Sequence, residues 1–65
     1  MRTNTWRQMA ALELRNMRYC YRHDFITDAL ISYGMARAYA IASRTTLHTA
    51  TYNWAVPRLG LGYRS

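Results

Sequence analysis

The chain has 65 residues, nine of them arginine and none lysine, against two aspartates and one glutamate, and its formal net charge is +6 at pH 7. A chain this short builds at most one small domain with a limited hydrophobic core. Its single cysteine, Cys20, excludes an internal disulfide. Hydrophobic residues make up 51% and aromatic residues 14% of the chain, which predicts an ordered protein and not a solvated tail.

Catalysis is not expected from a chain of this kind. An enzyme needs a sheltered pocket with several convergent polar groups, and so small a chain has little interior in which to build one. Cys20, His23 and Asp24 resemble half of a metal site, but tetrahedral zinc takes three or four protein ligands. We therefore expect no catalytic residues, no bound metal, no cofactor and no small-molecule substrate.

The arginines also argue against a secretory signal and against a simple membrane span. Five of them fall between Arg2 and Arg22 and interrupt any apolar signal segment. Asp28 and Arg37 interrupt the most apolar half of the chain, so that no run of about 18 apolar residues exists. A lipid-facing span is therefore not expected, while a span shielded by neighbouring proteins stays open.

A first helix is predicted over about residues 5–22. Residues 5–8, Thr-Trp-Arg-Gln, have the spacing of a capping box, in which a hydroxyl and an amide three residues later close the start of a helix. His23 and Asp24 mark its end, because cations favour a helix C-terminus and acids favour the start of the next helix. One bent continuous helix is the alternative, since neither glycine nor proline stands at this break.

A second helix is predicted over about residues 24–56, where Pro57 makes continuation unfavourable. Four threonines between residues 45 and 51 lower its helix propensity, but the segment has no period-two alternation and no partner strand, so helix is preferred over strand. Residues 57–65 are predicted to form an extended tail. The fold class is therefore all-α, with residues 1–65 as one small helical chain that has no independent core.

The first helix concentrates positive charge on one ridge. Placed at ~100° intervals, four arginines fall within an arc of about 80°, and apolar residues occupy most of the remaining perimeter. Arginine binds phosphate or carboxylate bidentately and stays charged at physiological pH, so RNA, lipid headgroups and acidic proteins are all candidate targets. A solvated polar face is the alternative. The predicted anion-binding residues are Arg7, Arg15, Arg18 and Arg22.

The second helix carries a heptad seam rich in small residues. Small side chains let two helix backbones approach closely, which suits docking against another helix. The alternative is that alanine is common simply because it is the best helix former. Gly34, Ala38 and Ala42 form a second small-residue track on a neighbouring face. The seam, which is the predicted helix-docking interface, consists of Ala29, Tyr33, Ala36, Ala40, Ser43, Leu47, Ala50 and Trp54.

These features together favour a subunit of a larger assembly. Ordering about 60 residues costs roughly 90 kcal/mol of conformational entropy, more than two helices offset against each other. We expect a non-catalytic accessory subunit whose partners are other protein subunits and anionic lipid. The arginine-rich, acid-poor N-terminal segment is typical of mitochondrial targeting, which favours an inner-membrane complex of the respiratory-chain or ATP-synthase type. The alternative is a small arginine-rich RNA-binding protein, such as a ribosomal subunit.

Overall fold

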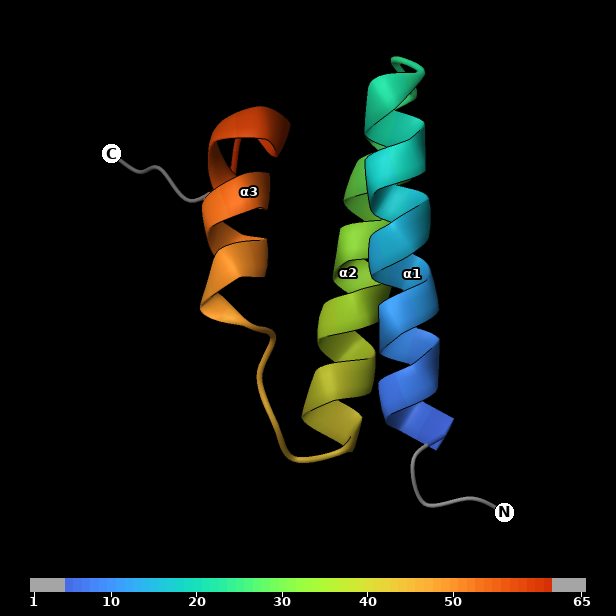
Figure 1. The fold of residues 1–65 in the computed structure, drawn as a ribbon, viewed down its shortest axis with the longest axis vertical. Helices are drawn as coiled ribbons and strands as arrows, with labels where there is room; N and C mark the ends of the chain where they lie inside the picture. Colours follow the sequence, from blue (N-terminus) through green and yellow to red (C-terminus); the bar gives the residue numbers. More distant parts are fainter. Residues whose placement is uncertain (1–4, 62–65) are drawn as a thin grey trace.

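The protein is an all-α structure of three helices, seen in a computed structural model that describes residues 5–61. Helix α1 spans Thr5–Arg22, α2 spans Ile26–Ala42 and α3 spans Thr49–Leu59 (Figure 1). The predicted fold class is confirmed, but the predicted pair of helices is wrong because the second helix divides in two. Within the described residues, none of the three helices is both long and apolar enough to cross a membrane.

The break between α1 and α2 lies where the sequence predicts it, at residues 23–25. Two hydrogen bonds close the end of α1: the Phe25 amide donates to the Cys20 carbonyl at 2.8 Å, and the Asp24 amide donates to the Tyr21 carbonyl at 3.1 Å. This pattern is a Schellman motif, with Asp24 in the left-handed conformation at φ 65°. The alternative of one bent continuous helix is therefore wrong. The predicted capping box begins at Thr5, whose side chain is not among those that the structure describes.

Helix α2 ends at Ala42, 14 residues before the predicted end at residue 56. A second Schellman motif closes it: Arg44 adopts φ 60°, and the Thr45 amide donates to the Ala40 carbonyl at 2.9 Å. Ser43 and the two threonines that follow have weak helix propensity, and they lead into a connector over residues 43–48. The break has no glycine or proline because Arg44 takes the left-handed position that glycine usually fills.

Helix α3 continues through Pro57 to Leu59, so the predicted extended tail from residue 57 is wrong for residues 57–59. Pro57 lies in the last helical turn, where only the carbonyl of the exposed Asn53 loses its amide partner. The buried Leu59 side chain holds that turn against the core, and Gly60 at φ 69° terminates it. Residues 60–61 of the predicted tail follow the helix without regular structure, and residues 62–65 lie outside the described residues.

The helices form a thin molecule with principal extents of 37 × 27 × 16 Å. Helices α1 and α2 are antiparallel neighbours, and α3 stands beside them after the connector returns along the hairpin (Figure 1). The Asn16 amide of α1 donates to the buried Ser32 hydroxyl of α2 at 2.7 Å, which fixes the register of the hairpin. Met17 is the one large side chain that is completely buried in the described part of the chain, so the core is small.

Candidate functional site

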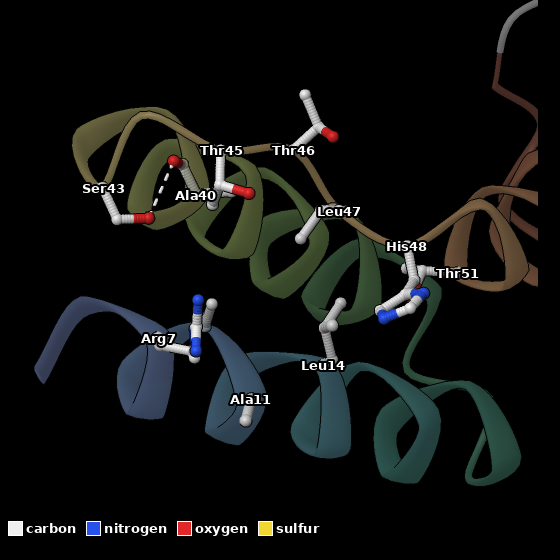
Figure 2. Close-up of a pocket in the computed structure, with 11 residues that line it drawn as sticks. Arg7, Ala11, Leu14, Ala40, Ser43, Thr45, Thr46, Leu47, His48 and Thr51 are labelled. Atoms are coloured by element: carbon white, nitrogen blue, oxygen red, sulfur yellow. Dashed lines mark hydrogen bonds between the residues drawn. The ribbon is translucent and has the colours of Figure 1, made fainter. Parts of the chain in front are cut away.

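A groove with arginines along one wall lies between α1 and the segment that runs from the connector into α3. Figure 2 shows the part of it near the start of α1, with Leu14 and Leu47 facing each other across the space and His48 turned toward α1. This part has a volume of about 490 Å³. All four arginines of the predicted ridge are exposed, and all four line this groove or its continuation along α1. We call it the arginine groove.

The arginine groove has two adjoining compartments that share Ala11, Leu14, His48 and Thr51. The first is mainly apolar, with Leu14 and the buried Leu47 in its floor and hydroxyl groups at its margin. The second carries three cations of α1, and none of the residues that line either compartment is acidic. The residues that complete the first compartment are Arg7, Ala10, Ala40, Ser43, Thr45 and Thr46, and those that complete the second are Arg15, Arg18, Arg22 and Ala50.

Trp54 of α3 connects the groove to the core. The Arg18 guanidinium lies 5.6 Å from the indole centroid, and the Arg58 guanidinium lies 4.9 Å from it. The Tyr21 ring meets the indole edge to face, with centroids 5.3 Å apart and an interplanar angle of 75°. The Arg58 guanidinium also donates a hydrogen bond to the Trp54 carbonyl at 2.9 Å, in the helical turn that contains Pro57. These contacts hold the Arg18 guanidinium between α1 and α3.

The structure divides the predicted docking seam between the interior and the surface. Its first half is buried: Ala29 and Ala36 have no exposed surface, and Tyr33 and Ala40 are nearly covered. The small side chains of this half therefore serve the close approach of α2 to α1 within one chain. The second half follows the break at the end of α2, so it does not continue the same stripe. Its members are Ser43, half-buried in the turn, Leu47, buried in the connector, Ala50, exposed on α3, and Trp54, half-buried on α3.

The opposite side of α2 is mainly apolar and uncovered, with Thr27 as an exposed polar residue in its first turn. Ile31, Met35 and Ile41 are 59%, 41% and 64% exposed. Gly34, Ala38 and Ala42, the second small-residue track, lie between them and are also exposed. At 3.6 residues per turn, these six positions fall on the side of α2 that faces away from the buried seam. We call this surface the outer face of α2, and it carries no arginine.

The fold changes the pKa of Tyr33, whose side chain lies in the interior. Burial raises the pKa of the Tyr33 hydroxyl above its ordinary value of 10.0, the nearby Tyr52 hydroxyl raises it further, and Arg37 opposes both. The rings of Tyr33 and Tyr52 are 6.4 Å apart in an edge-to-face arrangement. This pair links α2 to α3. Because the pKa of Tyr33 is raised, the folded state favours the protonated form of its hydroxyl.

Sequence reasoning assigned the four arginines but missed the residues across the groove from them. His48, Thr45 and Thr51 come from the connector and the start of α3, which the sequence predicts as parts of one long helix. Ser43, Thr45 and Thr46 are weak helix formers and give a partial signal of the loop, which Arg44 among them weakens. Comparison of the chain with known protein families, with curated proteins and with solved structures finds no match.

Proposed function

We propose that this protein is a non-catalytic helical subunit of a multiprotein assembly, and that it docks through the outer face of α2. The observation that carries this proposal is the exposure of Ile31, Met35 and Ile41 on one side of a single helix. Contiguous apolar side chains on a soluble surface typically mark a site of association. We also propose that the assembly is a mitochondrial inner-membrane complex, a location supported by the arginine-rich, acid-poor character of the N-terminal helix.

The energetics support completion of the core by another chain. The interface between α1 and α2 is lined largely by alanine, and Met17 is its one large, fully buried side chain among the described residues. Complete burial of an isoleucine or methionine side chain contributes about 1.5–3 kcal/mol. Covering the exposed parts of Ile31, Met35 and Ile41 therefore contributes roughly 3 kcal/mol, which is comparable with the whole core stability expected of a chain this short.

The chemistry of the outer face supports an apolar α-helix as the proposed partner. Gly34, Ala38 and Ala42 repeat every four residues, which leaves a shallow track along which a second helix approaches closely. The flanking isoleucines and methionine supply apolar contact on both sides of that track. Because the face carries no arginine, a partner that packs there does not meet the chain's net charge of +6 directly.

The test is the size of the particle that contains the protein in its source cells. The chain carrying a C-terminal tag is compared with its variants Ala38→Glu and Asn53→Glu, since both residues are exposed on helices but only Ala38 lies on the outer face, and neither lines the arginine groove. We expect the wild type and Asn53→Glu to sediment with a large complex in the mitochondrial membrane fraction, and Ala38→Glu to remain near the top of the gradient. Wild-type protein that sediments as a free 7.6 kDa chain contradicts the proposal.

A further inference from the structure

The arginine groove has the features of a binding site that the docking proposal leaves unused. Its cations are numerous, exposed and free of acidic neighbours in the lining. Of the chain's acidic residues, Asp24 lies in the α1–α2 turn and Asp28 lies in the first turn of α2. Glu13 lies on α1 more than 100° around the helix from the ridge. An anionic ligand in the groove therefore meets concentrated positive charge.

The length of the groove wall indicates a polymer and not a small anion. Arg7 and Arg22 are fifteen positions apart on one helix, which at 1.5 Å per residue is a distance of about 22 Å along the axis. A strand that keeps the stacking of a duplex carries one phosphate per ~3.4 Å along its axis, so about six stacked nucleotides cover this wall. Arg15, Arg18 and Arg22 follow one another at axial intervals of about 4.5–6 Å, which is one to two phosphate spacings of such a strand, so each guanidinium can contact a different phosphate.

The first compartment supplies contacts for a base and a sugar. Leu14 and Leu47 form an apolar floor, beside which the His48 ring lies (Figure 2). Apolar and aromatic surfaces bind the faces of unstacked bases, and hydroxyls at the margin, such as that of Thr45, suit a ribose 2′-hydroxyl. A membrane surface fits less well: Leu12 and Tyr19 are exposed on α1 beside the arginines, but a bilayer contacts one face of a helix, whereas this groove has a second wall, with His48 and Thr51, across from the arginines.

We infer that the arginine groove binds single-stranded RNA, with phosphates on Arg15, Arg18 and Arg22 and a base over the leucine floor. The inference does not depend on the proposed assembly, because the outer face of α2 and the groove share no residue. Arg7 extends the phosphate track toward the start of α1. Arg18 is held by Trp54, so its guanidinium is positioned before the ligand arrives.

The first experiment measures binding of the full chain to a fluorescein-labelled 20-nucleotide oligouridylate by anisotropy between 50 and 200 mM salt. Four arginine–phosphate contacts to a single strand predict an affinity that falls roughly 50-fold over this range. Arg15→Gln with Arg22→Gln leaves the Trp54 contacts intact, and the fall drops to about 7-fold. The control Arg37→Gln with Arg44→Gln removes the same charge from residues outside the groove and should keep the wild-type salt dependence. Equal effects of the two pairs overturn the inference, because they indicate attraction by net charge alone.

A second variant tests the groove without changing charge. Ala11 is exposed and lines both compartments, so Ala11→Leu fills the space between them. We expect at least a fivefold loss of oligouridylate affinity with an unchanged salt dependence, and we expect Ala38→Glu to bind as the wild type does. Unchanged binding by Ala11→Leu places the RNA outside the groove and overturns the inference. Tighter binding to cardiolipin-containing vesicles than to RNA, lost in Arg15→Gln with Arg22→Gln, also overturns it and assigns the groove to lipid headgroups.

Discussion

Trp54→Ala is expected to undock α3 while leaving α1 and α2 largely helical. The indole is the main large side chain that joins α3 to α1, through its edge-to-face contact with Tyr21 and its cation–π contact with Arg18. Helix α3 has only 11 residues, and isolated helices shorter than about 12–15 residues are marginal in water. Once undocked, α3 therefore unfolds locally.

The magnitude follows from the contacts that the substitution removes. The edge-to-face pair contributes about 1 kcal/mol and the exposed cation–π contact about 0.5–1 kcal/mol. The half-buried indole also loses roughly 100 Å² of covered apolar surface, or ~2.5 kcal/mol at 25 cal/mol per Å². The total is roughly 4 kcal/mol of docking free energy, which corresponds to a decrease of about 10²- to 10³-fold in amide protection within α3. The contact of Trp54 with Arg58 is left out because it lies within α3 itself.

Hydrogen–deuterium exchange measured by mass spectrometry resolves this effect by helix. The control is Trp6→Ala, which removes an indole that is 46% exposed and packs on Tyr39 at the other end of the hairpin, with ring centroids 5.7 Å apart. We expect the control to leave α3 protection near the wild-type value. Wild-type protection of α3 in Trp54→Ala refutes the reasoning, and so does an equal loss across all three helices, because that result means the chain has no separable unit.

Two further predictions concern stability. Arg44→Gly relieves a left-handed backbone at φ 60°, a strain of about 1 kcal/mol, and should raise Tm by roughly 4–8 °C. The control Arg37→Gly within α2 should lower Tm by a similar amount. Thermal melts followed by circular dichroism measure both changes, and a lower Tm for Arg44→Gly contradicts the assigned turn. Burial raises the pKa of Tyr33 in the folded state, so its contribution to stability is complete below pH 10.0 and is lost as the pH rises above it. Urea unfolding at pH 8 and pH 11 should show a smaller alkaline loss for Tyr33→Phe than for the wild type, while the exposed Tyr19→Phe keeps the full loss; equal losses in both variants count against the burial of Tyr33.

Local chemistry explains which breaks in the fold the sequence predicts. The first break is visible because cations before it and Asp24 within it mark the end of one helix and the start of another. The second break is hidden because its left-handed position holds Arg44, a residue that gives no turn signal. Pro57 predicts a helix end that the structure does not have, since a proline in the final turn removes one hydrogen bond without ending the helix.

One wall of the candidate site can be predicted from local sequence, whereas the other wall depends on tertiary structure. The exposure of Arg7, Arg15, Arg18 and Arg22 depends only on the periodicity of one helix, so the four share a surface once α1 forms. The opposite wall of the groove depends on the connector turning back beside α1, which no sequence period encodes. The seam was predicted as one stripe along a continuous helix, and the break after Ala42 separates its buried half from the rest.

The thinness of the molecule has a further consequence. The shortest extent is 16 Å, and the outer face of α2 points away from the side on which α1, the connector and α3 form the arginine groove. A helix packed on one side does not obstruct a strand lying on the other. Together the two proposals make the protein a tether: for an RNA that the assembly also binds elsewhere, the effective concentration at the groove reaches the millimolar range when the connection is short, so weak affinity in the groove is sufficient for capture.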